Sequence, residues 1–329
     1  MKRDVLELLE SAQGGYLSGQ SMAEAMGVSR AAVWKQIKRL RDAGYEIQAV
    51  TNLGYRLAGK PETISMDKLL EHLGDHPWRD RITLLDSVDS TNSLAKREAL
   101  HSAPHGSVFI AEEQTGGRGR QGRSFSSPRG KGVYLSVLLR PACAPSQVPH
   151  ATAMAAVAVC DAVEKVCGVR PGIKWTNDLL MGEKKLCGIL SEMSAEWESG
   201  TLESLVIGVG VNCGQTGEDF PEELREKATS IFLETGERPD RNQLAAALIQ
   251  GFYALSRDLL TAKDAWISRY ASDCLTLGRH VRILRGDRER RGVATGIDGN
   301  GALIVRYDTG ETGTVFSGEV SIRGENGYI

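Results

Sequence analysis

The sequence predicts an α+β protein of several domains, and three observations support this prediction. The chain has 329 residues, which at about 150 residues per domain should form two or three domains. Its 41% hydrophobic and 25% charged residues are typical of a folded globular protein. Helical periodicity covers residues 5–43 and 242–270, whereas from Gly278 short β-like runs alternate with Gly and Asp turns. We expect domains at residues 1–60, 66–271 and 272–329.

Composition excludes several classes of protein. The 40 Lys and Arg residues against 42 Asp and Glu give a net charge of -2, so the chain is not a uniformly basic nucleic-acid coat. No apolar run approaches the roughly 20 residues of a membrane-spanning helix. Acids interrupt the start, MKRDVLELLE, where a signal peptide would be apolar. We therefore expect a cytoplasmic protein with no membrane partner. The cysteines form no CxxC pair and no zinc spacing, which predicts reduced packing residues at Cys143, Cys160, Cys167, Cys187, Cys213 and Cys274.

Charge is divided unevenly along the chain. Residues 1–60 carry nine Lys or Arg and six acids, a balance of +3 that leaves -5 for the remainder. This asymmetry indicates a small anion-binding module joined to an acidic body. The join is expected within residues 58–66, AGKPETISM, where Gly59 and Pro61 break regular structure.

The first module should contain three helices. Apolar spacing predicts one helix over residues 5–12, a short second helix and a longer third helix over residues 30–43. A capping box of Ser21 and Glu24 would begin the second helix. Gly27 would then supply the sharp turn into the third.

The third predicted helix is basic and is followed by residues 45–57, which have the pattern of a β-hairpin. A tight turn and a basic second helix form the helix-turn-helix that enters a major groove, and the hairpin would be its wing. We expect Trp34 to pack in the core or at its edge rather than to contact a base. The alternative is a three-helix interaction domain with a solvated cationic face, but concentration of the cations on one helix favours DNA. The candidate DNA-binding residues are Ser29, Arg30, Lys35, Gln36 and Arg39.

The segment DSVDSTN, residues 86–92, follows the apolar run ITLL and precedes a helix that begins near Ser93. Hydroxyl and amide groups at a helix start, together with exposed backbone N–H groups, favour polar or anionic ligands. Simple N-capping is the alternative, and it explains this segment better when the segment is taken alone. The candidate ligand-binding residues are Ser90, Thr91 and Asn92.

A strongly cationic loop follows the strand-like run SVFIAEEQT, and residues 115–131 contain five cations and no acid. Gly117, Gly119 and Gly122 satisfy GxGxxG, but a strand rather than a helix follows, so we reject a dinucleotide fold. The chain also lacks the GxxxxGK[ST] motif of a P-loop. The loop could clamp phosphate and carboxylate groups or grip nucleic acid, and the alternative is a solvated charge run. Its cations are Arg118, Arg120, Arg123, Arg129 and Lys131.

Residues 174–190, KWTNDLLMGEKKLCGIL, have the pattern of a β-hairpin with a two-residue turn. Alternation places Lys185 on the same face as Cys187 and Ile189. A lysine there would be partly buried, where its charge must meet an anion or lose its proton.

Asn177 and Asp178 stand at the start of this hairpin. Their oxygens could bind a hydrated magnesium ion, which usually takes one or two carboxylates plus phosphate oxygens. Asp178 is therefore the candidate metal ligand. The alternative, better for a lone lysine pair, is a surface hairpin with Lys184 and Lys185 in water.

In combination these segments resemble the biotin protein ligases. With the amino-terminal helix-turn-helix, the chain resembles the bifunctional form of that family, biotin protein ligase and biotin operon repressor. The motifs DSVDSTN, EEQTGGRGRQGR, KWTNDLLM, KKLCGIL and GVGVN are individually modest but jointly specific in this order. The resemblance covers all three expected domains. It implies a winged helix-turn-helix, a central mixed α/β catalytic domain like the class II synthetase-like biotin/lipoate ligases, and a small SH3-like β-barrel at the carboxyl end.

The resemblance also implies roles for individual residues. The implied catalytic residues are Lys185, Arg118 and Arg120. The implied biotin contacts are Ser90, Thr91, Asn92, Gln114, Arg118, Gly119, Arg120 and Lys185. The implied nucleotide contacts are Arg120, Arg123, Phe125, Asn177 and Asn212. The chain departs from the family at Thr176, where Pro is common, and at Phe125, where a Trp would stack more extensively on adenine.

The implied reaction has two steps. Biotin carboxylate attacks the α-phosphate of ATP in the presence of Mg²⁺, giving biotinyl-5′-AMP and pyrophosphate. A lysine of the biotin carboxyl carrier protein of acetyl-CoA carboxylase then takes the biotinyl group. ATP and biotin are substrates, so no tightly bound prosthetic group is expected. The adenylate-bound enzyme would form a homodimer and bind operator DNA to repress biotin synthesis genes.

Two alternatives stay open. A related lipoate ligase or octanoyl transferase would differ in its acyl pocket, but it would have no reason to carry the winged helix. A regulator that binds an effector and catalyses nothing would not need the complete set of Arg118, Arg120 and Lys185. The carboxy-terminal arginines could meet nucleotide or the carrier, although solvation is the simpler interpretation for most of them. These residues are Arg279, Arg282, Arg285, Arg288, Arg290 and Arg291.

Overall fold

The computed structural model of the chain describes residues 4–42, 45–59, 63–196, 200–285, 288–316 and 320–324. The chain forms two compact units, Met1–Thr63 and Ile64–Ile329, and each is described by itself. The division falls within the polar segment, residues 58–66, that the sequence predicts as a join. No helix in the described ranges is long and apolar enough to span a membrane.

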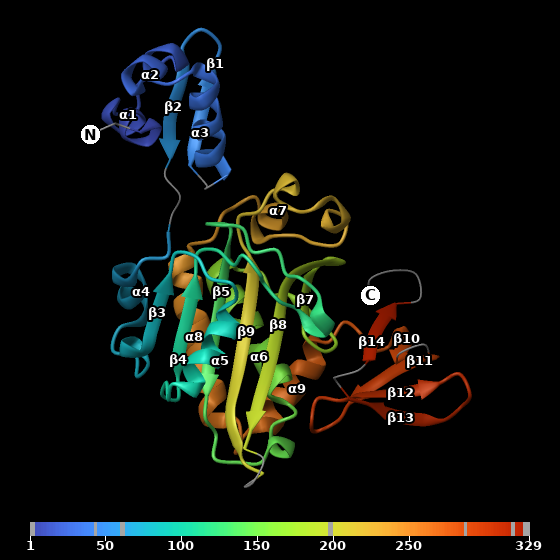
Figure 1. Cartoon of the computed structure of the whole chain (residues 1–329). Coiled ribbons are helices and arrows are strands. Elements are labelled where there is room, and N and C mark those ends of the chain that lie inside the picture. Colours follow the sequence, from blue (N-terminus) through green and yellow to red (C-terminus); the bar gives the residue numbers. More distant parts are fainter. Residues whose placement is uncertain are drawn as a thin grey trace. The chain divides into compact units, whose positions relative to one another are not determined.

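The first unit is a helix-turn-helix with a β-hairpin wing (Figure 1). Helices α1 (Val5–Ser11), α2 (Gly19–Met26) and α3 (Arg30–Asp42) precede strands β1 (Glu46–Val50) and β2 (Gly54–Gly59), which pair antiparallel. This order confirms the predicted helices and wing; residue 43, expected to end the third helix, lies outside the described ranges. One contiguous apolar core holds the unit together. It contains Val5, Leu8, Leu9, Met22, Ala23, Met26, Val33, Ile37 and Ile47.

Two expectations for this unit were wrong. Helix α2 begins at Gly19 because Ser18, rather than Ser21, is its N-cap: the Ser18 Oγ accepts from the Ser21 backbone N–H at 3.0 Å. Trp34 is 57% exposed rather than packed in the core. Val33 and Ile37 take the inward positions on α3, and Trp34 is one residue further round the helix, at about 100°.

The second unit is built on a mixed sheet that has seven strands among the described residues, in the order β3-β4-β5-β9-β8-β7-β6. Only the β3–β4 pair is parallel in this sheet. The strands are β3 (Ile82–Leu85), β4 (Ser107–Ala111), β5 (Gly132–Leu139), β6 (Gly172–Lys174), β7 (Asp178–Met181), β8 (Lys184–Ala195) and β9 (Leu202–Asn212).

Helices cover both faces of this sheet (Figure 1). Val108 and Val137 belong to a large core with α6 (Ala151–Cys167) and α8 (Arg241–Asp258), and α4 (Met66–Leu73) packs against α8. Phe109 and Leu138, one residue further along the same strands, face the opposite way and pack against α5 (Thr91–Leu100). The period-two alternation of the strands therefore separates the main core from the face on which α5 begins.

The carboxy-terminal strands form a second sheet, antiparallel and with five strands in the part of the chain that is described. It contains β10 (His280–Arg285), β11 (Arg288–Ile297), β12 (Leu303–Tyr307), β13 (Thr312–Val315) and β14 (Val320–Gly324). This small antiparallel domain confirms the expected fold class. It is joined to the larger sheet where the Trp175 Nε1–H donates to the Gly301 carbonyl at 2.9 Å. The short helix α7 (Ile231–Thr235) and helix α9 (Lys263–Asp273) complete the unit.

Two compositional expectations can be compared with the structure. All six cysteines are free thiols, and five of them are buried, in agreement with a packing role. Burial raises the pKa of both Cys160 and Cys213 to about 12. Among the carboxy-terminal arginines, Arg282 and Arg291 both pair with Glu289 at the surface. The side chains of residues 285 and 288 lie outside the description.

The start of the second unit is fastened by a buried ion pair. Arg241 Nη1 lies 3.0 Å from Glu112 Oε2, and the two side chains are 6% and 9% exposed. The other carboxylate oxygen of Glu112 accepts the backbone N–H of Ile64. The Arg241 guanidinium also donates to the Gly132 carbonyl at 3.1 Å. This pair links α8, the end of β4 and the entry to β5.

Replacing Arg241 with methionine should strongly destabilise the second unit, because the Glu112 carboxylate would stay buried without its partner. We expect a loss of about 3–5 kcal/mol in the free energy of unfolding. The matched control is Arg97→Met, which removes an exposed pair with Asp89 at 3.0 Å and should leave stability nearly unchanged. Urea unfolding of the full chain measures the free energy of unfolding of both variants. Equal losses in the two variants would contradict the stabilising role of the buried Arg241–Glu112 pair.

Candidate functional site

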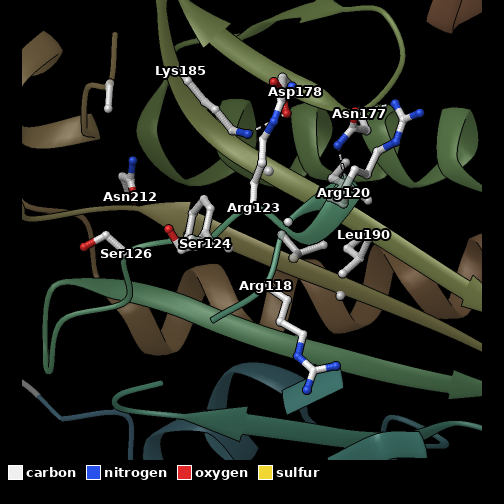
Figure 2. Close-up of a pocket in the computed structure, with 18 of the residues that line it drawn as sticks. Arg118, Arg120, Arg123, Ser124, Ser126, Asn177, Asp178, Lys185, Leu190 and Asn212 are labelled. Atoms are coloured by element: carbon white, nitrogen blue, oxygen red, sulfur yellow. Dashed lines mark hydrogen bonds and ion pairs between the residues drawn. The ribbon is translucent and has the colours of Figure 1, made fainter. Parts of the chain in front are cut away.

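A cavity of about 440 Å³ lies in the second unit (Figure 2). It is bounded by the first residues of α5, the loop of residues 114–126, strands β7, β8 and β9, and residues 220–228. Two cations of the predicted loop lie outside the cavity, where Arg129 pairs with Asp86 and Lys131 with Asp219. The other central-domain residues suggested for ligand, nucleotide or metal binding all line this one cavity. These are Ser90, Thr91, Asn92, Gln114, Arg118, Gly119, Arg120, Arg123, Phe125, Asn177, Asp178, Lys185 and Asn212.

Helix α5 points its first turn into the cavity through a polar network. Ser90 is the N-cap, and its Oγ accepts from the Ser93 N–H at 3.4 Å, so the capping interpretation of this residue also holds. The Thr91 backbone N–H donates to Gln114 Oε1 at 2.8 Å, and Gln114 Nε2 donates to Ser127 Oγ at 2.9 Å. These bonds fix the orientation of the Gln114 amide at the edge of the cavity.

Asn92 is the most constrained residue of that turn. Its Oδ1 accepts from Ser136 Oγ at 2.6 Å, and its Nδ2 donates to the Leu190 carbonyl at 3.1 Å and to Glu192 Oε2 at 3.0 Å. Asn92 is 4% exposed, and Gly208 lies directly beneath it: a Cβ at residue 208 would overlap Asn92 Oδ1. The amide therefore supports the cavity wall, and its polar atoms are engaged within the protein.

Glycines on the central strands make room for the cavity and its aromatic side chain. A Cβ on Gly210 would overlap the Phe125 ring, and one on Gly188 would lie 3.3 Å from the same ring. Phe125 thus packs against the glycines of β8 and β9. Lys185 Nζ is 5.9 Å from the centre of that ring.

The three arginines of the cationic loop that line the cavity are placed differently. Arg118 and Arg123 are exposed, and in Figure 2 the Arg118 guanidinium points away from Lys185 and Asp178. Arg120 is half-buried, and its Nη1 donates to Thr176 Oγ1 at 2.8 Å and to Asn177 Oδ1 at 3.2 Å. Burial lowers the pKa of Arg120, although an arginine stays protonated in proteins. The loop is therefore attached to the β6–β7 turn through Arg120.

Lys185 lies in the cavity in an ion pair with Asp178, with 2.6 Å between Nζ and Oδ1 (Figure 2). The expected anion partner is present. The expected strand face was wrong, because Lys185 was predicted on the same face as Cys187 and Ile189. The β7–β8 register shifts, with Leu180 opposite Lys185 but Leu179 opposite Cys187, so one extra residue interrupts the alternation. Because of this bulge, Lys185 lies on the side of Gly188, where a Cβ would be 3.2 Å from Nζ.

Asn212 ends β9 and holds the neighbouring segment rather than pointing free into the cavity. Its Nδ2 donates to the Thr229 carbonyl at 2.9 Å, and its Oδ1 accepts from Gln215 Nε2 at 3.0 Å. Residues 220–228, including Lys227, form the wall beside it. The Lys185 N–H donates to the Lys227 carbonyl at 2.8 Å, which couples this wall to β8.

Charge in the cavity is strongly unbalanced. Asp178 is the only acid among the described residues that line it. A cavity with this excess of cations is suited to a ligand that carries several negative charges. The cationic lining residues are Arg118, Arg120, Arg123, Lys174, Lys185 and Lys227.

Sequence reasoning missed the residues that support this site from a distance. Ser136 and Glu192 come from β5 and β8 and meet Asn92 only in the folded chain. Lys227 belongs to a segment without a recognisable motif. The glycine pattern of GVGVN was a usable signal, since alternate glycines in a strand indicate close approach of another group.

In the first unit the five DNA-binding candidates lie on or next to α3. Ser29 caps that helix, because its Oγ accepts from the Ala32 N–H at 3.2 Å. Gln36 is half-buried. The candidates with exposed side chains are Ser29, Arg30, Lys35 and Arg39.

Three family models match successive parts of the chain. Residues 2–56 match the HTH domain, residues 84–212 the biotin/lipoate A/B protein ligase family, and residues 276–323 the biotin protein ligase C terminal domain. The matches follow the order of the elements described above.

Relatives match along almost the whole chain. A bifunctional ligase/repressor BirA of Bacillus subtilis is 37% identical over 311 residues, covering 94% of this chain and 95% of the relative. The bifunctional ligase/repressor BirA of Escherichia coli is 32% identical over 314 residues, covering 95% and 94%. A solved biotin protein ligase from Aquifex aeolicus, in complex with biotin and ATP, superposes with a TM-score of 0.64 at 28% identity. The match covers 74% of this chain and 99% of the Aquifex aeolicus chain.

Glu192 should make the stability of the site depend on pH. Burial disfavours its charged form, but hydrogen bonds from Lys96 at 2.7 Å and from Asn92 outweigh burial and lower the pKa of Glu192. Its stabilising contribution is complete above the unfolded pKa of about 4.3, and it is lost as pH falls through the lower folded value. Glu192→Gln should therefore lower the urea midpoint at pH 7. It should have little effect below the folded-state pKa of Glu192, where the parent carboxyl group is also uncharged.

The matched control is Glu71→Gln on α4, which replaces an exposed carboxylate. Urea midpoints of the two variants and the parent chain, measured from pH 7 downwards, give the comparison. A Glu192→Gln deficit that is constant over the whole range would show that the charge of Glu192 is not responsible.

Proposed function

The chain belongs to the family of bifunctional biotin protein ligases and repressors, and on this basis we propose that it activates biotin as biotinyl-5′-AMP. The biotinyl group is then transferred to a lysine of a carboxyl carrier protein, in the reaction of a biotin-[acetyl-CoA-carboxylase] ligase. The same chain is a DNA-binding repressor of biotin synthesis genes. The observation that carries the proposal is the cavity whose described lining contains six cations and one carboxylate.

The first step joins two anions, which repel each other unless cations neutralise them. An oxygen of the biotin carboxylate attacks the α-phosphorus of ATP, and the bond to the β-phosphate oxygen breaks to release pyrophosphate. Lys185 is the residue suited to hold both anions, because its ammonium group lies in the cavity and is held in place by Asp178 at 2.6 Å. Its contribution is positioning and charge neutralisation, without a covalent bond.

The product is a mixed anhydride that hydrolyses if water reaches it. Arg118 and Arg120 belong to the loop over the cavity, and closing this loop over the adenylate excludes water. Phe125 offers a ring face for adenine, and Asn177 and Asn212 offer polar groups near it. Ser90, Thr91, Asn92 and Gln114 form the end of the cavity suited to the polar ring of biotin.

Magnesium accompanies ATP in this proposal and contributes neutralisation of phosphate charge. The described residues contain no cluster of three or more His, Cys, Asp or Glu side chains that could hold a metal. Asp178 alone offers a carboxylate, and it is already paired with Lys185. This donor set fits an ion that arrives with the nucleotide and takes its other ligands from phosphate and water.

In the second step the amine of the carrier lysine attacks the biotinyl carbonyl. The bond to the AMP oxygen breaks, the amine loses a proton, and an amide remains. The proposed setting is the cytoplasm, with the carrier domain as protein partner. Repression would use a ligand-dependent homodimer that places two α3 helices on the two halves of an operator.

ATP–pyrophosphate exchange on the purified chain tests the first step without requiring the carrier. Biotin, lipoate and octanoate are supplied separately. We expect exchange with biotin alone. Exchange with lipoate or octanoate would contradict the proposed substrate, and exchange with none of them would leave a regulator that catalyses nothing.

Lys185→Met should lower the rate of biotin-dependent exchange by about 10²–10³-fold, the usual effect of removing a preorganised stabilising group. Lys184→Met is the matched control, since the neighbouring lysine does not line the cavity, and it should keep nearly normal exchange. The measurement is the initial rate of pyrophosphate exchange for each variant and for the parent chain. Equal rates for the two variants would remove Lys185 from the assigned role.

Lys35→Ala should weaken binding to duplex DNA and make that binding less sensitive to salt. A lysine that neutralises one phosphate contributes about 0.9 to the slope of log affinity against log salt concentration. Fluorescence anisotropy with a mixed-sequence duplex at several salt concentrations measures the slope. Lys68→Ala, an exposed lysine on α4 of the second unit, is the control and should not change it.

A further inference from the structure

We propose that Thr176 is a positioning residue whose hydroxyl holds Arg120 and orders the cationic loop before any ligand binds. The inference rests on the proposed function and extends it to a residue without an assigned role. The contact that carries it is the hydrogen bond from Arg120 Nη1 to Thr176 Oγ1 at 2.8 Å. Thr176 is 7% exposed, so this bond forms at a largely buried point.

The turn that carries Thr176 is fixed from behind. The hydroxyl of Tyr270, a fully buried side chain on α9, donates to the Thr176 carbonyl at 2.9 Å. The Trp175 backbone N–H donates to Thr276 Oγ1 at 3.0 Å, and its indole N–H donates to the Gly301 carbonyl. Three separate segments therefore hold residues 175–176, and Thr176 presents its hydroxyl from a rigid support.

The loop itself has few such supports near its tip. Gln121 and Gly122 are exposed and have positive φ values of 56° and 71°. The loop's own backbone bonds, from the Gly119 N–H to the Arg123 carbonyl at 2.7 Å and from the Phe125 N–H to Gly117, close it locally. The Arg120 side chain is the tip residue that reaches across to the fixed turn. Its bond to Thr176, together with that to Asn177 at 3.2 Å, sets where the tip lies.

A hydroxyl is suited to this task because it accepts the hydrogen bond without neutralising the arginine. A carboxylate at the same place would form an ion pair and compete with an anionic ligand for the guanidinium. With Thr176 the hydrogen bond adds no negative charge beside the guanidinium. Ordering the tip in advance also lowers the conformational entropy lost when ligand binds, which tightens binding without altering the chemical step.

The test uses Thr176→Val, which replaces the hydroxyl with a methyl group of similar size, and Thr176→Ser, which keeps the hydroxyl. Hydrogen exchange of the ligand-free full chain is measured for residues 116–126. We expect about tenfold faster exchange in Thr176→Val, the loss of one hydrogen bond to a charged group, and near-normal exchange in Thr176→Ser. Exchange in β9 should be unchanged in both variants, which controls for a general loss of fold.

Activity supplies a second, independent readout. In ATP–pyrophosphate exchange, Thr176→Val should raise the KM for biotin and ATP about tenfold while kcat stays within about twofold, because the lost contact supports ground state and transition state equally. Preformed adenylate should also leave the variant about tenfold faster. In an Arg120→Gly background the valine substitution should have no further effect, since the two residues act through one bond.

Each outcome decides a separate point. Parent-like hydrogen exchange and KM in Thr176→Val would overturn the inference. An undiminished valine effect in the Arg120→Gly background, or failure of Thr176→Ser to restore the parent behaviour, would reduce Thr176 to a packing residue and overturn it as well. Faster loop exchange in Thr176→Val, together with a parent chain that activates no acid, would support the ordering role and overturn the proposed function.

Discussion

The excess of positive charge facing one cavity is the constraint on which the rest of the second unit depends. Among the described residues that line this cavity there are six cationic side chains and a single carboxylate, Asp178, which pairs with Lys185. Such an arrangement favours a ligand with several negative charges, and it must keep its cations apart until that ligand arrives. The fold achieves this by placing the cations on different elements: the loop after β4, the end of β6, β8 and the segment after β9.

The sheet forms the floor of this arrangement, and the loop of residues 114–126 forms another of its walls. Glycines at residues 188, 208 and 210 lower the floor of the cavity and admit the Phe125 ring and the Asn92 amide. Opposite this floor, the turn at residues 175–176 is fixed by α9 and by the carboxy-terminal strands. The small β domain therefore supports one wall of the site, although none of its described residues lines the cavity. Arg120 connects the loop to that wall.

Much of this could be predicted from the sequence, because local signals are strong where chemistry and turns coincide. In the first unit the order of helices and strands followed from periodicity, whereas α4 and α6 were not predicted and the helical stretch 242–270 is divided into α8 and α9. The cavity brings together all of the central residues for which the family resemblance implied a role. The errors have physical causes that no local pattern reveals. A bulge in β8 reversed the face of Lys185, and Ser18 was a better cap for α2 than Ser21. Ser136 and Glu192 acquire their roles only through pairing with Asn92 across strands distant in sequence. The sequence alone predicted no consequence for the Thr that replaces the family's usual Pro at residue 176. Its contact with Arg120 exists only in the folded chain.

The central claim is that this cavity makes and retains an acyl-adenylate, and a single-turnover experiment tests it most directly. The purified chain is mixed with biotin and an equimolar amount of ATP labelled at the α-phosphate, and free small molecules are removed by rapid gel filtration. We expect the label to elute with the protein only when biotin is present, and we expect mass spectrometry to identify the bound compound as biotinyl-5′-AMP. Label that never accompanies the protein, or that does so equally without biotin, would contradict it.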